Sequence, residues 1–119
     1  MAIKPLISLN GDYRSSRKDA PAFSYLAAGY YNCLIKAGAI PVIIPPLADE
    51  DDINRVLDHV DGMVLCGGAD LDPRHDGFMT HPAMRLLDSR RENFDRLLMQ
   101  LVAERKMPVM GIGCGLQLL

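Results

Sequence analysis

The chain has 119 residues, a length that fits one compact domain. Hydrophobic residues make up 49% of it and charged residues 24%, a composition typical of a globular protein. The net charge is −2 and the 13 basic residues are scattered, so neither nucleic acid nor a membrane surface is an expected partner.

The cysteines and the apolar runs predict the cellular compartment of the protein. Cys33, Cys66 and Cys114 are odd in number and lack both metal-ligand spacing and a disulfide pattern, which favours a reducing, cytoplasmic location. The N-terminus does not have the pattern of a signal peptide, and apolar runs such as residues 39–46 are too short to span a bilayer.

Short apolar runs alternate with helical patterns along the whole chain. The first run ends at the turn signal Asn10-Gly11-Asp12, and a helix is predicted from Asp19 and Pro21 to the stop at Gly38. Further helices are predicted over residues 49–59 and 84–106. The runs that predict strands cover residues 5–9, 41–45, 63–66 and 108–112.

This alternation predicts an α/β fold of the flavodoxin-like kind, with three layers and a parallel sheet. The strands are apolar without alternation, as expected when both faces of the sheet are covered. Ligands bind beyond the carboxyl ends of such strands, so residues 10–17, 66–77 and 111–115 are the candidate binding loops. Because the chain stops one turn into a helix, we expect residues 1–119 to form a single α/β domain that continues in a longer protein.

A strand-to-helix turn stands out at residues 111–117, GIGCGLQ. Gly111 and Gly115 flank it, which places Gly113 at its apex, where the backbone is strained and a side chain would stand above the sheet. The amides that follow open a helix, and their N–H groups favour a developing oxyanion.

This turn resembles the Gly-x-Cys-x-Gly-x-Gln elbow of the class I glutamine amidotransferase superfamily. Residues 30–41, 57–73 and 91–115 further resemble one branch of it, the gamma-glutamyl-gamma-aminobutyrate hydrolase family. The resemblance implies hydrolysis of a gamma-glutamyl amide by an elbow cysteine, assisted by a later histidine and an acid, with no cofactor. It also implies a small gamma-glutamyl or carboxylate ligand.

The resemblance assigns roles to individual residues of this chain. Gly68 and the backbone of Cys114 would form the oxyanion hole, while Gly67 and Gln117 would help to hold the glutamyl group. The nucleophile position holds Gly113, so we expect a turn without covalent chemistry and an inactive homologue. The alternative is that Cys114 acts as a displaced nucleophile, although one step along a helix rotates a side chain by about 100°.

Several other residues have both a functional and a structural interpretation. Arg14 lies at the predicted binding edge and could meet a substrate carboxylate, but an ordinary solvated loop explains it equally well. Cys33 and Cys66 are expected in the core, and the Arg91-Glu92 pair is expected to brace the long helix. The loop around His75 and His81 is interpreted as turn chemistry, so no metal site is expected.

Two hypotheses from other classes remain open. A flavodoxin-like module could bind a nucleotide or another small molecule without catalysis, although neither glycine stretch matches a phosphate-binding motif. The chain could also be a structural subunit. The oligomeric state, a homodimer included, is left open.

Overall fold

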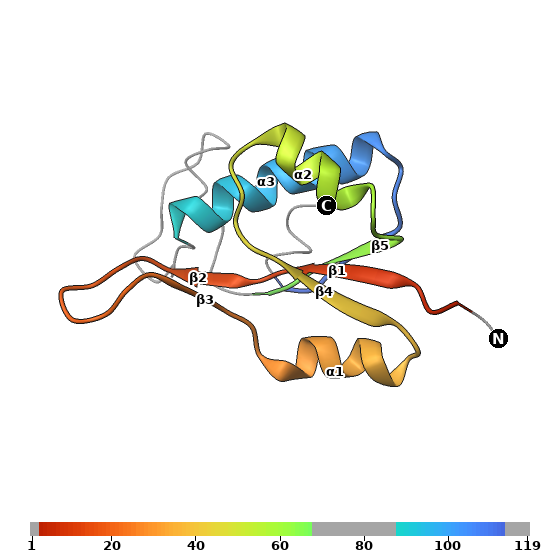
Figure 1. Ribbon diagram of the computed structural model, residues 1–119, viewed down its shortest axis with the longest axis horizontal. Coiled ribbons are helices and arrows are strands. Elements are labelled where there is room, and N and C mark those ends of the chain that lie inside the picture. Colours follow the sequence, from red (N-terminus) through yellow and green to blue (C-terminus); the bar gives the residue numbers. More distant parts are fainter. Residues whose placement is uncertain (1–2, 68–87, 114–119) are drawn as a thin grey trace.

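A computed structural model describes residues 3–67 and 88–113, and it contains a parallel sheet of four strands. The strands are β1 (Leu6–Asn10), β4 (Ile40–Ile44), β5 (Gly62–Leu65) and β6 (Val109–Gly111), in the spatial order β4-β1-β5-β6. Helix α1 (Ala28–Lys36) covers one face, while α2 (Glu50–Leu57) and α3 (Ser89–Glu104) cover the other (Figure 1). The predicted three-layer α/β fold is therefore confirmed.

The placement of the helices follows from the direction of the crossovers. The chain moves from β1 to β4 in one direction across the sheet, and from β4 to β5 and then β6 in the other. Since crossovers between parallel strands are right-handed, the two directions place their helices on opposite faces. All three crossovers leave the carboxyl ends of the strands at one edge.

The main core lies between the sheet and the pair α2 and α3. Its buried members are all apolar: Ile44, Ile53, Leu57, Met63, Leu65, Phe94, Leu98, Leu101 and Val102. The opposite face has a smaller cluster of Leu9, Val64 and Cys66, packed by half-buried residues of α1. The prediction that Cys66 lies in the core is confirmed.

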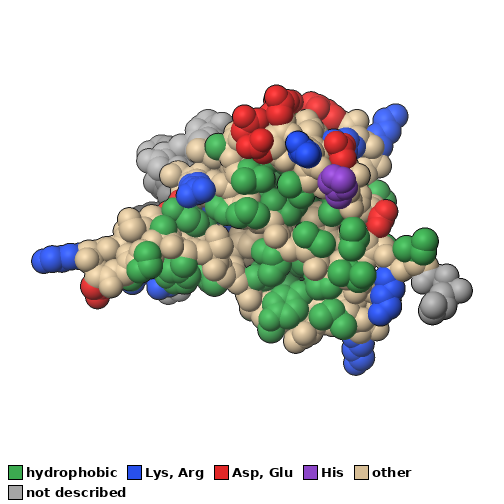
Figure 2. Space-filling view, viewed as in Figure 1, with side chains coloured by type: hydrophobic (Ala, Val, Ile, Leu, Met, Phe, Trp, Pro, Cys, Tyr) green, Lys and Arg blue, Asp and Glu red, His purple; other side chains and the backbone are tan. Residues whose placement is uncertain are grey.

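The α1 face is the less completely covered of the two. No residue of α1 is buried, and Cys33 is exposed, so the expectation that Cys33 packs in the core is wrong. Ile43 and Met110 are also exposed, with 48% and 61% of their surface accessible. Figure 2 shows hydrophobic side chains gathered over the middle of the molecule and acidic ones over α2.

The ends of the helices have identifiable capping contacts. Asp49 caps α2, since its carboxylate accepts a hydrogen bond from the Asp51 amide at 2.7 Å. Asp88 caps α3 in the same way through the Arg90 amide at 2.9 Å. Gly38 ends α1 with φ +95°, a left-handed conformation that favours glycine.

One predicted helix is partly wrong. Residues before Ala28 form an antiparallel hairpin of β2 (Asp12–Arg14) and β3 (Phe23–Tyr25), which projects from the body of the domain (Figure 1). Asn10 to Asp12 is accordingly no turn, because β1 leads directly into β2. Phe23 and Tyr25 fit the two-residue period of a strand as well as a loose helical pattern. In such a short segment the apolar spacing does not distinguish a strand from a helix.

No helix within the described part of the chain is long and apolar enough to cross a membrane.

Candidate functional site

Two glycines meet at the carboxyl edge of the sheet. Beyond the last paired strand residues, the Ile112 amide still donates a hydrogen bond to the Leu65 carbonyl at 2.9 Å. This contact holds the ends of β5 and β6 together, so Gly67 and Gly113 face one another. Gly113 has φ +59°, and a Cβ atom built there would lie 3.2 Å from the Gly67 Cα atom. Gly113, the predicted apex of the bend, therefore has a left-handed backbone, while residues 114–117 lie outside the described part of the chain.

Gly67 is confined by its neighbours as well. A Cβ atom at this position would lie 3.0 Å from the Tyr30 hydroxyl oxygen and 3.3 Å from the Ile112 carbonyl oxygen. Any side chain at residue 67 would therefore displace the phenol or the backbone of the next strand. Tyr30 was missed as a site residue because its spacing in α1 matches an ordinary core position.

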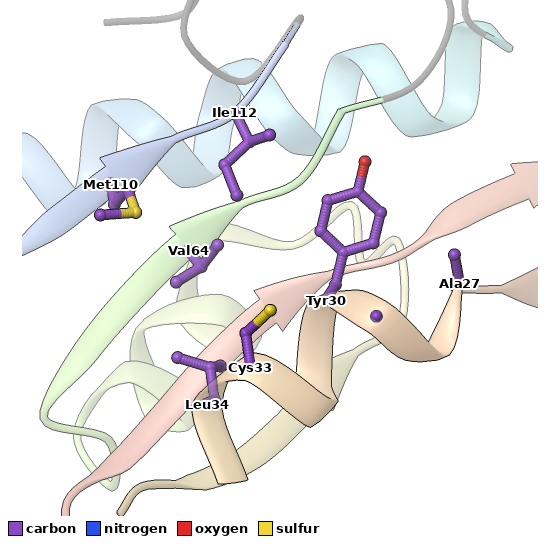
Figure 3. A pocket seen from close by; sticks show the side chains of 8 residues that line it. Ala27, Tyr30, Cys33, Leu34, Val64, Met110 and Ile112 are labelled. Carbon is purple, nitrogen blue, oxygen red and sulfur yellow. The ribbon is translucent and has the colours of Figure 1, made fainter. Parts of the chain in front are cut away.

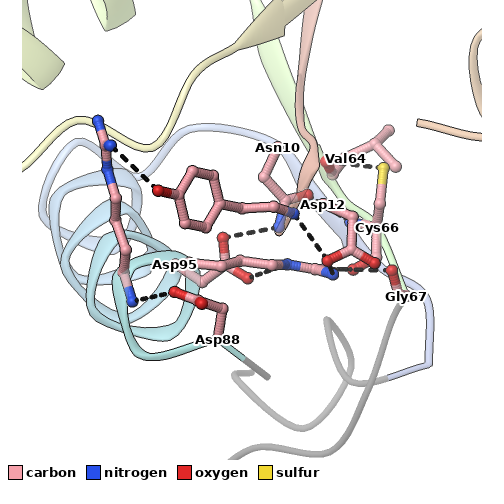
Figure 4. A network of polar contacts seen from close by, with 10 residues as sticks. Asn10, Asp12, Val64, Cys66, Gly67, Asp88 and Asp95 are labelled. Atoms are coloured by element: carbon pink, nitrogen blue, oxygen red, sulfur yellow. Dashed lines mark hydrogen bonds and ion pairs between the residues drawn. The ribbon is translucent and has the colours of Figure 1, made fainter. Parts of the chain in front are cut away.

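A buried arginine, Arg91, contacts the backbone at this edge of the sheet, and Figure 4 shows the polar network around Cys66, Gly67 and Asp95. Arg91, in the first turns of α3, donates from Nη2 to the carbonyl oxygens of Cys66 at 3.0 Å and Gly67 at 3.1 Å. Its Nε atom lies 3.2 Å from Oδ2 of Asp95, and Nη1 lies 2.9 Å from Oδ1 of Asp12. One guanidinium thus joins α3, β2 and the end of β5.

Asn10 completes the network from β1. Its Nδ2 atom donates to Oδ1 of Asp95 at 2.8 Å, and its Oδ1 atom accepts from the Cys66 amide at 2.6 Å. Burial raises the pKa of the Asp95 carboxyl from 3.8 to about 6, although the Asn10 hydrogen bond and the Arg91 charge both act to lower it. A neutral amide and a guanidinium therefore share a carboxyl group whose pKa is raised to about 6.

An apolar pocket of about 400 Å³ opens between α1 and the two last strands (Figure 3). Tyr30 and Ile112 belong both to this pocket and to the surroundings of Gly67, so the two regions are continuous. Its walls are almost entirely nonpolar, which suits the hydrocarbon part of a ligand better than a charged group. The lining residues are Ala27, Gly29, Tyr30, Cys33, Leu34, Val64, Met110 and Ile112.

The predicted site residues fall into three groups. Gly67 and Gly113 are brought together, whereas Gly68, Cys114, Gln117 and the loop with His75 and His81 lie outside the described residues. Arg14 lies on the hairpin with its guanidinium 5.4 Å from the centre of the Phe23 ring, so its contact with a substrate stays a prediction. Across residues 3–67 and 88–113, no three His, Cys, Asp or Glu side chains are grouped to hold a metal ion.

Most of the polar network was not predicted from the sequence. Arg91 was interpreted as bracing for a helix, Asn10 only as part of a turn and of a candidate binding loop, and Asp95 was given no role. A possible signal was the i, i+4 spacing of Arg91 and Asp95 on the apolar side of an amphipathic helix. Their partners on β1 and β2 could not be identified without the topology.

Comparison with known proteins places these features in a family. A family model described as Peptidase C26 matches residues 5–119. A candidate glutamine amidotransferase of Mycobacterium tuberculosis, Rv2859c, is 34% identical over 99% of this chain and 39% of its own length. A candidate glutamine amidotransferase-like protein of Rickettsia prowazekii, RP404, is 29% identical over all of this chain and 43% of its own length.

A third similar protein, a candidate glutamine amidotransferase of Schizosaccharomyces pombe, is 30% identical over 82% of this chain and 38% of its own length. The chain therefore spans about two fifths of the length of these relatives. The match to the family model covers residues 5–119 and includes every element described above. The chain belongs to the Peptidase C26 family of glutamine amidotransferase-like proteins.

Proposed function

We propose that this chain forms the carbonyl-binding part of a glutamine amidotransferase-like site, and that it binds a gamma-glutamyl amide without covalent attack from position 113. The observation that carries the proposal is Gly113 itself. Gly113 has a left-handed φ of +59° and lies next to Gly67. The resemblance places the nucleophile at this position, and glycine has no side chain that could attack a carbonyl.

The glycine bend is suited to a binding role. Gly113 follows a strand and begins a turn, and backbone N–H groups at such a turn favour an oxygen atom that carries partial negative charge. The Tyr30 hydroxyl beside Gly67 adds a polar group that could donate to a carbonyl or carboxylate. The neighbouring apolar pocket would accept the methylene groups of a glutamyl chain.

The alternative within the same family is attack by Cys114. Its thiol would have to reach the same carbonyl from one residue further along the chain, and such a step turns a helical side chain by about 100°. A misplacement of this size costs the near-attack geometry that covalent catalysis requires. We therefore assign position 114 a backbone role in the proposal, through its N–H group.

Release of ammonia from L-glutamine and of aniline from a gamma-glutamyl anilide tests the proposal. The protein is measured beside Cys114→Ala, and the same samples are titrated with L-glutamine while the melting temperature is recorded. We expect no turnover above buffer in either protein and a rise in melting temperature with glutamine in both. Turnover that disappears in Cys114→Ala would assign covalent attack to Cys114 and overturn the proposal.

A second titration separates the flavodoxin-like alternative. Mononucleotides should leave the melting temperature unchanged, because neither glycine of the bend belongs to a phosphate-binding motif. Stabilisation by a mononucleotide, without stabilisation by glutamine, would favour nucleotide binding.

A further inference from the structure

We infer that Arg91 is a positioning residue of the ligand site: it sets the direction of the Gly67 peptide by holding two successive carbonyl groups at the end of β5. This inference rests on the proposed function for what the peptide binds. The claim about the direction of the peptide concerns the protein without ligand and can be tested separately.

The contacts of Arg91 are concentrated on one short stretch of backbone. Nη2 donates to the carbonyl oxygens of both Cys66 and Gly67, at 3.0 and 3.1 Å. Successive carbonyls of a strand point to opposite sides, so one donor can reach both only where the strand has ended and the chain turns. The guanidinium therefore acts where β5 gives way to the glycine bend.

A planar trans peptide points its C=O and N–H groups in opposite directions. Arg91 thus fixes the Gly67 carbonyl end of that peptide against α3. The resemblance assigns an oxyanion-hole N–H to Gly68, the next residue, which lies outside the described residues. Arg91 does not need to touch the ligand in order to determine whether the N–H faces it.

The guanidinium is held from two further sides. Asp95 accepts from Nε at 3.2 Å, Asp12 lies 2.9 Å from Nη1, and the Arg91 side chain is almost fully buried. Asn10 binds both Asp95 and the Cys66 amide, so the N–H and the C=O of Cys66 are both fixed by the same network. A planar fork can make these contacts together, whereas an ammonium group presents a single point charge.

Arg91→Lys tests the inference, with Arg105→Lys as the matched control. Arg105 also donates from Nη2 to a backbone carbonyl, that of Asn54 at 2.8 Å, and pairs with the carboxylate of Asp58, but it lies at the far end of α3. Three quantities are measured for each protein: NMR resonances of Cys66 and Gly67 without ligand, the dissociation constant of L-glutamine, and the melting temperature.

We expect Arg91→Lys to shift the Cys66 and Gly67 resonances and to weaken glutamine binding by at least about ten-fold, the effect of one hydrogen bond to a charged group. Arg105→Lys should leave both quantities unchanged, whatever it does to the melting temperature. Arg91→Lys that binds glutamine within about two-fold of the unaltered protein would overturn the inference.

Two further outcomes distinguish the positioning role of Arg91 from the proposed function. If the unaltered protein does not bind glutamine, the proposed function fails, and unshifted Gly67 resonances in Arg91→Lys would then overturn the positioning role as well. If Arg91→Lys does not fold, Asp12→Asn replaces it, because this change weakens one of the contacts that orient the guanidinium and leaves the buried Asp95 paired. It should shift the same two resonances, and their constancy would also overturn the inference.

Discussion

Gly113 rests against Gly67 at the carboxyl edge of the sheet, with only 3.2 Å between the Gly67 Cα atom and the place where a Cβ atom of residue 113 would stand. Two independent features make a side chain at this point unfavourable. The left-handed φ of +59° strains any residue with a Cβ atom, and the contact is with backbone that cannot rotate away.

Gly113→Ala should therefore lower the free energy of unfolding by about 1–3 kcal/mol, measured by urea denaturation. Gly113→Asn should cost less, because asparagine tolerates the left-handed region while keeping the Cβ contact. Gly29→Ala in α1 is the control, since a Cβ atom there meets nothing within 4 Å and alanine favours helix. Equal losses for the alanine and asparagine variants would attribute the effect to the contact alone.

Asn10→Ala should be more damaging than its size suggests. The change removes two buried hydrogen bonds, one from the Cys66 amide and one to a carboxylate oxygen of Asp95, which costs about 2–4 kcal/mol in the free energy of unfolding. Asn54→Ala, which removes an exposed contact with Arg105, should cost less than about 1 kcal/mol. Similar losses in the two variants would contradict the central place of Asn10.

The raised pKa of Asp95 predicts a pH dependence of stability. The carboxyl binds a proton more tightly in the folded protein, with a pKa of about 6 against 3.8, so the unfolding free energy falls as pH rises from about 4 to about 6. The difference is about two units at about 1.4 kcal/mol each, which sets a maximum near 3 kcal/mol.

Urea denaturation of the unaltered protein and of Asp95→Asn across this pH range checks the prediction. The stability of the unaltered protein should fall relative to the variant between pH 4 and 6, and the difference should be constant above the folded pKa. Parallel curves for the two proteins over the whole range would show that Asp95 does not titrate there.

The N-terminal cap of α2 should contribute measurably to stability. Asp49→Ala removes the hydrogen bond to the Asp51 amide and should lower the free energy of unfolding by about 1 kcal/mol. Asp51→Ala removes one exposed charge in the same turn and should cost only about 0.3–0.5 kcal/mol through the helix dipole. The comparison fails if the second variant loses as much as the first.

Thiol labelling should distinguish two of the cysteines. Cys33 is exposed on α1 and Cys66 is fully buried at the end of β5, so a maleimide should modify Cys33 first under native conditions. Mass spectrometry of the digested protein measures both sites, and Cys33→Ser identifies the peptide. Modification of Cys66 as fast as Cys33 would contradict the packing of the smaller core cluster.

The order of strands and helices could be predicted because each element carries a local signal. The apolar runs, the helix predicted from residue 49 and the Gly38 stop depend on neighbours within one turn, and the structure confirms them. The hairpin at Phe23 was missed for the same reason, because too few residues define its period and the strand partner at Arg14 is nine residues away.

The left-handed glycine after β6 could also be predicted, because glycines at alternate positions after a strand indicate a tight turn. What tertiary structure alone decided is the set of contacts across the sheet: Gly67 against Gly113, the Tyr30 hydroxyl beside them, and Arg91 on the Cys66 and Gly67 carbonyls.

The physical reason for this division is the range of the interactions. Capping, periodicity and backbone preference act within a few residues, so the sequence by itself determined the type and order of the elements. Asn10 and Asp95, in contrast, are 85 positions apart and meet only because right-handed crossovers bring β1 and α3 to the same edge of the sheet. The hydrogen bond between Asn10 and Asp95 could therefore be identified only from the tertiary structure.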